Sequence, residues 1–257
     1  MIKAIFFDID GTLVPLFEPD GKIVPSTMDA LHQLREKGIK VFIASGRPVN
    51  HLTIVSSQFD FDGYVAINGQ YCTVGDKVLR NILMDKTHYL DAVEYAEKHQ
   101  LTLSVSGPRF NAINFLTDRS REFLKRAEDF EPVDLRQYAN EDIYFMMLFV
   151  DRKDEQPFLD IMPEVKCVRW NPLYCDVIPK NGGKDIGIQS VLDELGIDVS
   201  ESMCFGDGGN DIPMLDYCGL SVAMGNADDE VKAHADYVTD DVRNDGVLKA
   251  LKHFNII

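Results

Sequence analysis

The 257-residue chain has no CxxC pair among its five cysteines, no N-x-[ST] sequon and no long apolar run. The longest such run, Ile143 to Val150, is far shorter than the ~20 residues that a membrane-spanning helix needs. The first residues, Met1 to Asp8, form a short apolar run that ends in acids, unlike a signal peptide. Scattered cysteines in a chain of this length are typical of reduced thiols. We therefore expect a cytoplasmic protein without a membrane partner.

Positive charge is also scarce, with 26 Lys and Arg against 42 Asp and Glu and a formal charge of -16. This balance argues against a nucleic-acid partner, because the phosphate backbone attracts basic surfaces. A small anion can still bind where a few positive groups gather locally. The chain shows no internal repeat and no low-complexity tract, and its length fits one large domain or two small ones.

Apolar runs alternate with helical patterns at both ends of the chain, which is typical of a parallel α/β sheet. Ser26 is the expected N-cap of the first helix, Asp29 its capping-box partner, and Gly38 its stop. The expected strands of this part are 2–7, 39–44, 63–67, 203–205 and 220–224, and the expected helices are 25–38, 48–58, 184–195, 211–217, 228–235 and 244–254.

The middle of the chain has a different order of elements. Residues 70–81 are typical of a hairpin that turns at Gly75-Asp76. Pairs of consecutive strands then indicate antiparallel pairing and an α+β unit. Its expected strands are 101–106, 109–115, 143–150, 165–170 and 173–178, and its expected helices are 86–99, 118–129 and 153–161. We predict a Rossmann-like α/β core, residues 1–82 and 183–257, with an inserted α+β cap, residues 83–182.

The segment Asp8-Ile9-Asp10-Gly11-Thr12 directly follows the first buried strand. Open α/β sheets bind ligands at this end of their strands. Carboxylates at positions i and i+2 leave a strand on the same side and repel each other. The pair is tolerable if a cation lies between them or if one acid stays protonated, and both conditions suit metal-assisted phosphoryl transfer.

A second acidic segment, Gly206-Asp207-Gly208-Gly209-Asn210-Asp211, follows another expected strand. Its glycines permit a tight turn, and its carboxylate and amide oxygens suit a hard cation such as magnesium. A plain turn is the alternative, since Gly, Asn and Asp dominate turns. Together with the first motif, the segment favours a metal site.

Two weaker signals accompany these motifs. Ser45-Gly46-Arg47 follows the second strand, where a hydroxyl and backbone N–H groups that enter a helix can hold a phosphate. A capped helix start explains this tripeptide equally well. Lys184 begins a helix after Gly182-Gly183, but the spacing does not match a P-loop. It gains weight only because phosphate charge needs a cation nearby.

Taken together, the motifs resemble those of the haloacid dehalogenase superfamily of phosphohydrolases, and most closely its Cof-type branch with an inserted α/β cap. The resemblance covers essentially the whole chain. Its motifs, in order, are Asp8-Ile9-Asp10-Gly11-Thr12, Ala44-Ser45-Gly46-Arg47, Asn68-Gly69, Lys184 and Gly206-Asp207-Gly208-Gly209-Asn210-Asp211. The second motif of the family often carries Thr where this chain has Ser45, which keeps the hydroxyl.

The resemblance implies a phosphatase that acts on small phosphorylated metabolites, with sugar phosphates as the expected class. Asp8 is then the nucleophile and Asp10 the general acid and base. Magnesium is implied as the cofactor, held by Asp8, Asp207 and the backbone carbonyl of Asp10. Asp211 is implied to support the ion indirectly, through water or through contacts with the ligands. The groups implied to bind the phosphoryl oxygens are Ser45, Gly46, Lys184 and Asn210.

The same resemblance implies that the cap sets specificity. The candidates are Arg47 and Asn68 at the core rim and Asp176 in the cap, for which an exposed strand residue is the equal alternative. A phosphomutase and a non-enzymatic phospho-acceptor module remain alternatives, although the module would not need Asp10. We expect a monomer or a weak homo-oligomer.

Overall fold

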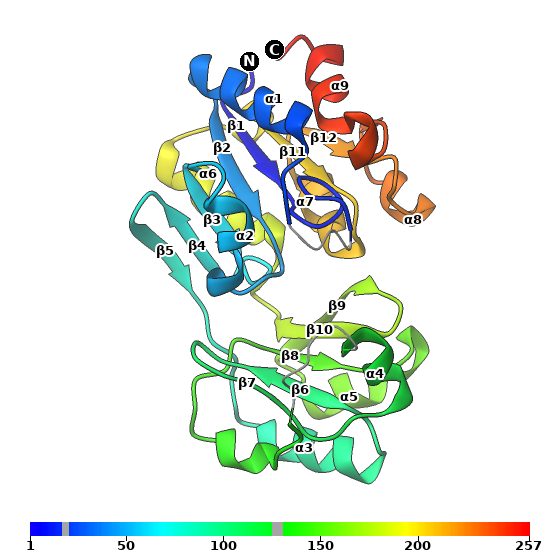
Figure 1. Ribbon diagram of the computed structural model, residues 1–257. Helices are drawn as coiled ribbons and strands as arrows, with labels where there is room; N and C mark the ends of the chain where they lie inside the picture. The colour runs from blue at the N-terminus through cyan, green and yellow to red at the C-terminus, as the bar shows by residue number, and fades with distance from the viewer. Residues whose placement is uncertain (17–20, 125–130) are drawn as a thin grey trace. The chain divides into compact units, whose positions relative to one another are not determined.

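The computed structural model describes residues 1–16, 21–124 and 131–257, and the chain forms two compact units (Figure 1). The first unit contains Met1–Asn81 and Gly182–Ile257, and the second unit, Ile82–Asn181, is inserted between them. Across the described ranges, no helix combines the length and the apolar character of a membrane span.

The first unit is built on an eight-stranded sheet with the order β13-β12-β11-β1-β2-β3-β4-β5. The strands from β13 to β3 are parallel, whereas β4 and β5 form the expected hairpin at one edge. The strands are β1 (Ala4–Phe7), β2 (Lys40–Ala44), β3 (Gly63–Ala66), β4 (Tyr71–Val74), β5 (Lys77–Asn81), β11 (Ser202–Gly206), β12 (Leu220–Ala223) and β13 (Tyr237–Val238).

Helices cover both faces of this sheet, with α1 beside α9 on one face and α6 beside α7 on the other (Figure 1). Because both faces are covered, β1 is buried along its whole length. The helices are α1 (Pro25–Glu36), α2 (Thr53–Ser56), α6 (Lys184–Leu195), α7 (Ile212–Tyr217), α8 (Asp229–Lys232) and α9 (Gly246–His253), with short 3-10 turns η1 (Val49–His51), η4 (Val199–Glu201), η5 (Gly209–Asp211) and η6 (Val242–Asn244).

The N-terminus of α1 differs from the sequence expectation. Pro25 is the first helical residue and Val24 takes the N-cap position, so the expected Ser26 cap is wrong. Proline fits the first helical position because its fixed φ suits the helix and its missing N–H would have no partner there. The buried hydroxyl of Ser26 has no hydrogen-bond partner in the described part of the chain. At the other end, Gly38 has a φ of +75° just after the helix, as expected.

The inserted unit contains a five-stranded antiparallel sheet with the order β7-β6-β8-β10-β9. Helices α3 and α5 pack on one face of it through a shared apolar core. Its strands are β6 (Leu103–Ser106), β7 (Asn111–Ile113), β8 (Phe145–Leu148), β9 (Val165–Asn171) and β10 (Tyr174–Pro179), its helices α3 (Tyr89–Lys98), α4 (Asp118–Leu124) and α5 (Gln156–Ile161), and its 3-10 turns η2 (Leu135–Tyr138) and η3 (Arg152–Asp154).

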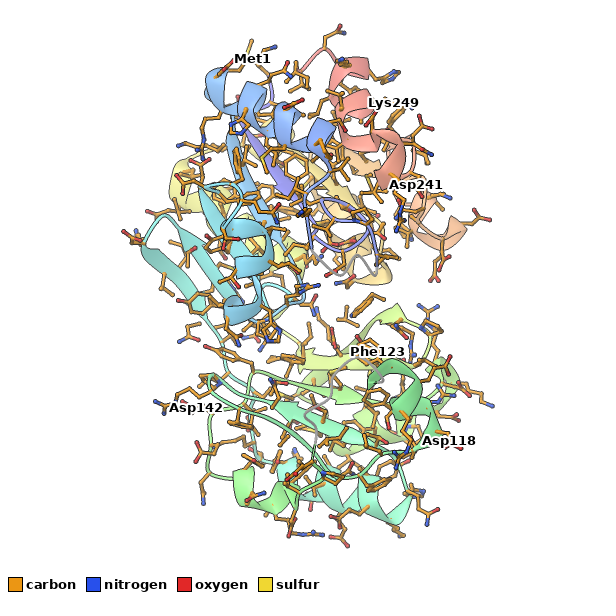
Figure 2. All side chains as sticks on the ribbon, viewed as in Figure 1. Met1, Asp118, Phe123, Asp142, Asp241 and Lys249 are labelled. Atoms are coloured by element: carbon orange, nitrogen blue, oxygen red, sulfur yellow. The ribbon has the colours of Figure 1, made fainter. Side chains whose placement is uncertain are left out.

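An aromatic cluster joins α4 to the β9–β10 hairpin. The ring centroid of Phe123, labelled in Figure 2, lies 4.7 Å from that of Tyr174 and 6.3 Å from that of Trp170. The single tryptophan therefore packs against its own unit. The helix expected to run to residue 129 begins at Asp118 as predicted, and its end lies outside the described residues.

Candidate active site

Four neighbouring parallel strands of the first unit end at the same edge of the sheet. Asp8 follows β1, Ser45 follows β2, Asn68 lies just beyond β3, and Asp207 follows β11. Because β11, β1, β2 and β3 are consecutive in the sheet, these side chains gather in one place. Lys184 joins them at the start of α6, where the N–H of Gly183 donates to the carbonyl of Asn68 at 2.7 Å.

Lys184 is the buried cation of this cluster. Its Nζ donates to Oδ1 of Asp8 at 2.6 Å and to Oδ1 of Asp211 at 2.5 Å. All three side chains are buried, and those of Lys184 and Asp211 are fully so. Asp211 is fixed further by the N–H groups of Asp207 and Gly208, which donate to its Oδ2 at 2.9 and 2.8 Å. This network fixes the orientation of the Asp8 carboxylate.

Asp207 is held by two side chains that the sequence analysis did not assign a role. Thr12 donates its hydroxyl to Oδ1 at 3.2 Å, and Asn226 donates its amide to Oδ2 at 3.1 Å. The same amide nitrogen donates to the carbonyl of Gly11 at 3.0 Å, and Oδ1 of Asn226 accepts from the N–H of Val242 at 3.1 Å. The signal that could have found Asn226 is its place just beyond the buried strand β12, at the same sheet edge.

Two glycines make room for the acids. A Cβ atom on Gly11 would lie 2.0 Å from Oδ2 of Asp207, and φ at Gly11 is +86°. A Cβ atom on Gly206 would lie 2.6 Å from Cγ of Asp211. Both positions therefore require glycine if the carboxylates are to come this close.

The cluster carries more negative than positive charge. Carboxylate oxygens of Asp8, Asp207 and Asp211 lie within 4.8 Å of one another, and the ammonium of Lys184 contacts two of these acids. Burial raises the pKa of Asp8 to about 7, although the charge of Lys184 opposes the change. Burial, followed by repulsion from Asp8 and Asp211, raises the pKa of Asp207 to about 9. A hard divalent cation, which prefers oxygen ligands, fits this donor set and would balance its charge.

Asp10 lies apart from this cluster and pairs with Arg47. Nε of Arg47 donates to Oδ2 of Asp10, and Nη2 donates to Oδ1, each at 2.7 Å. Two parallel hydrogen bonds of this kind fix the carboxylate plane. About a third of each side chain is exposed, so Asp10 faces the open side of the site.

Polar side chains also gather around Gly46. Nδ2 of Asn210 donates to Oδ1 of Asn68 at 3.2 Å, and a Cβ atom on Gly46 would lie 3.2 Å from the same oxygen. Ser45 is buried, and its Oγ accepts from the N–H of Arg47 at 3.2 Å. The structure thus brings together every predicted site residue of the first unit.

Asp176, the remaining predicted residue, belongs to the inserted unit. It lies on β10 between Cys175 and Val177, which point into the core of that unit. Strand alternation directs Asp176 to the opposite face. Its side chain is buried, so the alternative of an exposed strand residue is wrong.

Comparison with known proteins identifies the family. Residues 5–251 match the family model of the haloacid dehalogenase-like hydrolases. The chain belongs to this family. YkrA of Bacillus subtilis strain 168, a candidate phosphatase, is 30% identical over 257 residues, which cover 99% of this chain and 98% of YkrA.

Two further relatives have stated activities. The 5-amino-6-(5-phospho-D-ribitylamino)uracil phosphatase YcsE of the same Bacillus strain is 28% identical, over 98% of this chain and 96% of YcsE. The solved structure of BT4131, a sugar phosphatase of haloacid dehalogenase subclass IIB, superposes with a TM-score of 0.90 and 36% identity, over 99% of this chain and all of that one. The resemblance found from the motifs is confirmed, as is the α/β fold class, and the protein is a phosphatase of phosphoric monoesters.

Proposed function

We propose that the protein is a magnesium-dependent phosphatase of small phosphorylated metabolites, with sugar phosphates as its substrate class. The observation that carries the proposal is the cluster of Asp8, Asp207 and Asp211 beside the buried Lys184, at the strand edge where α/β sheets bind ligands. The likeness to BT4131, a sugar phosphatase, supports the substrate class.

Asp8 is the nucleophile in this proposal. One oxygen of its carboxylate attacks phosphorus, the bond from phosphorus to the leaving oxygen breaks, and an aspartyl-phosphate forms. Lys184 assists this step by positioning the nucleophile. Its hydrogen bond of 2.6 Å orients the Asp8 carboxylate, and its charge favours the ionised form of Asp8. The hydroxyl of Ser45, the N–H of Gly46, the amide of Asn210 and the ammonium of Lys184 supply donors for the phosphoryl oxygens.

Asp10 is the general acid and base. It gives a proton to the leaving alkoxide and then takes one from the water that hydrolyses the aspartyl-phosphate. Arg47 holds both of its oxygens, which fixes the carboxylate next to the open side of the site. Arg47 and Asn68 at this rim and Asp176 on β10 are the proposed specificity residues, with residues 83–182 as the specificity cap.

Magnesium is the proposed cofactor, held by Asp8, Asp207 and the backbone carbonyl of Asp10, with Asp211 in support. When bound, it neutralises charge on the acids and on the phosphoryl group. Asp211 already accepts hydrogen bonds from Lys184 and from two backbone N–H groups, which suits a supporting part rather than direct ligation. Thr12 and Asn226 orient Asp207 for this purpose.

Phosphate release from a panel of metabolite phosphates, with magnesium and with chelator, tests the proposal. We expect magnesium-dependent release with sugar phosphates ranked first, and loss of release in Asp8→Asn. Release that persists in chelator would contradict the magnesium requirement, and a top rank for nucleotides would contradict the substrate class. Turnover that needs a bisphosphate activator would favour a phosphomutase. A stable phosphorylated protein without turnover would favour the phospho-acceptor module.

A further inference from the structure

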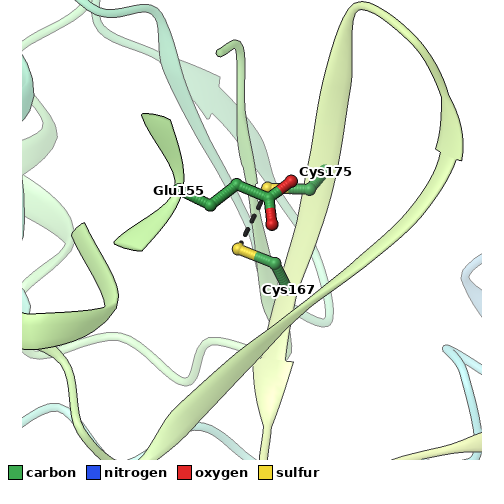
Figure 3. Close-up of side chains that lie close together, drawn as sticks. All are labelled: Glu155, Cys167 and Cys175. Atoms are coloured by element: carbon green, nitrogen blue, oxygen red, sulfur yellow. Dashed lines mark hydrogen bonds between the residues drawn. The ribbon is translucent and has the colours of Figure 1, made fainter. Parts of the chain in front are cut away.

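Two thiols of the inserted unit face each other across its terminal pair of strands. Sγ of Cys175 on β10 lies 3.1 Å from Sγ of Cys167 on β9, as the dashed line in Figure 3 shows. Cys167 pairs in register with Val177, so strand alternation places Cys167 and Cys175 on the same face of the sheet. Neither residue belongs to the cluster around Asp8.

The two thiols differ in exposure. Cys175 is fully buried in the core of its unit, and its hydrogen bond to Cys167, followed by burial, raises its pKa. Cys167 is only partly buried at the margin of the same core. A small oxidant therefore reaches Cys167 first, and Cys175 is then the only thiol beside it that the structure describes.

The two sulfurs lie close to the separation that a disulfide requires. A disulfide needs a sulfur–sulfur distance of about 2.05 Å, so the two atoms must approach by about 1 Å. β9 is the edge strand of its sheet, and its one strand partner in the described ranges is β10. The register between the two strands also shifts between Tyr174 and Asp176, next to Cys175. The proposed disulfide requires this shift at the irregular edge of the sheet.

We propose that Cys167 and Cys175 form a redox modification site that closes to an intramolecular disulfide when the oxidant is a peroxide. The Cys167 thiolate attacks hydrogen peroxide, which releases hydroxide and leaves a sulfenic acid. The Cys175 sulfur then attacks that sulfur, and water leaves. In total, two thiols and one peroxide give one disulfide and two waters.

A metal ion held by these thiols and the nearby Glu155 carboxylate is the rival occupant. Glu155 is already engaged, because Nε and Nη2 of Arg169 donate to its Oε1 at 2.9 and 2.7 Å. Arg169 also donates to the backbone carbonyls of Val150, Asn171 and Pro172, which anchors the pair in place. Two thiolates on tetrahedral zinc lie about 3.8 Å apart, so the sulfurs would have to separate. The geometry favours the disulfide.

Peptide mapping of the full-length protein tests the proposal directly. Trypsin cleaves after Lys166, Arg169 and Lys180, so Cys167 and Cys175 fall on separate peptides, 167–169 and 170–180. After mild peroxide treatment and alkylation of free thiols, we expect these two peptides to be linked. The intact chain should be lighter by about 2 Da, and dithiothreitol should reverse the change. Cys167→Ser should abolish the linkage, whereas the control Cys218→Ser, at a buried thiol of the other unit, should retain it.

Three outcomes would overturn the proposal. One is stepwise oxidation of Cys167 to sulfinic acid with Cys175 still free to be alkylated in the unfolded chain. Another is linkage of Cys167 to a second protein molecule. The third is a protein isolated with one zinc per chain that blocks both thiols until a chelator is added, which would show that the pair is a metal site. The peptide mapping needs only the wild-type protein, so it still tests the proposal if Cys167→Ser fails to fold.

Discussion

The side-chain amide of Asn226, in the loop after β12, holds the carboxylate of Asp207 at the end of β11, with 3.1 Å between Nδ2 and Oδ2. The same nitrogen is bonded to the carbonyl of Gly11, so one side chain connects the loop after β1 to the loop after β11. In the proposed site, Asp207 is a magnesium ligand that is oriented from outside by Asn226.

Replacing Asn226 tests this orienting role. We expect Asn226→Ala to raise the dissociation constant for magnesium by about 10-fold or more, because partners that orient metal ligands commonly have effects of that size. Turnover at saturating magnesium should fall much less. Calorimetric titration of magnesium gives the affinity without a need for activity. Asn244→Ala, at an exposed position two residues beyond Val242, is the matched control and should bind magnesium as the wild type does.

Gly11 and Gly38 form a second matched pair, because both have positive φ but only one faces an acid. A Cβ atom on Gly11 would lie 2.0 Å from Oδ2 of Asp207, whereas a Cβ atom on Gly38 would meet nothing within 4 Å. Both alanine variants should lose about 1–2 kcal/mol of folding free energy from the left-handed backbone. Only Gly11→Ala should also weaken magnesium binding. Equal magnesium affinity in the two variants would contradict the proposed role of Asp207 as a magnesium ligand.

The raised pKa of Asp207 makes the metal-free protein sensitive to pH. Its pKa rises from 3.8 to about 9 on folding, mainly through burial. The folded state therefore binds the proton more tightly than the unfolded state, and stability falls as pH rises from about 4 to about 9. In chelator at pH 8, Asp207→Asn should raise the free energy of unfolding by about 1–3 kcal/mol and flatten its pH dependence.

Urea unfolding of the wild type and Asp207→Asn, each at pH 5 and pH 8, measures this effect. Asp240→Asn, which removes the carboxylate of an exposed ion pair with Lys249, is the control and should leave the pH dependence unchanged. The assigned direction of the Asp207 pKa would be contradicted if, without metal, the wild type gained stability relative to Asp207→Asn between pH 5 and pH 8.

The sequence predicted those site residues that come directly after a buried strand. Asp8, Ser45 and Asp207 each follow an apolar run, and parallel strands in one sheet bring such positions to the same edge. Asn226 also follows an expected strand, 220–224, but its contact with Asp207 could not be predicted, because that contact depends on β12 lying beside β11 and on the path of the loop back toward Gly11.

The limits of local patterns are also visible at Asp10 and Ser26. The alternation expected for Asp8 and Asp10 holds only within a strand, and β1 ends at Phe7, so Asp10 turns to Arg47 while Asp8 meets Lys184. Ser26 matches a capping pattern, but Pro25 can itself begin the helix and moves the cap to Val24. The end of the strand decided the first outcome, and the preceding proline decided the second.

Asp10 should matter most for substrates with poor leaving groups. Such alkoxides need a proton as the bond to phosphorus breaks, whereas p-nitrophenolate leaves without one. In Asp10→Asn, we expect the first step to fall by about 100-fold or more for a sugar phosphate and far less for p-nitrophenyl phosphate. Pre-steady-state rates of leaving-group release for both substrates measure this difference. Equal losses on both substrates would contradict the acid role.

The most direct test of the central claim is to trap the phosphoryl group on Asp8. In Asp10→Asn with magnesium and p-nitrophenyl phosphate, the first step needs no acid but the hydrolysis lacks its base, so the aspartyl-phosphate should accumulate. After acid quench, mass spectrometry of the tryptic peptide 4–22 should show a gain of about 80 Da on Asp8, absent when Asp8→Asn is added. Steady release of p-nitrophenolate with no phosphorylated peptide, or with the phosphoryl group on another residue, would contradict the account.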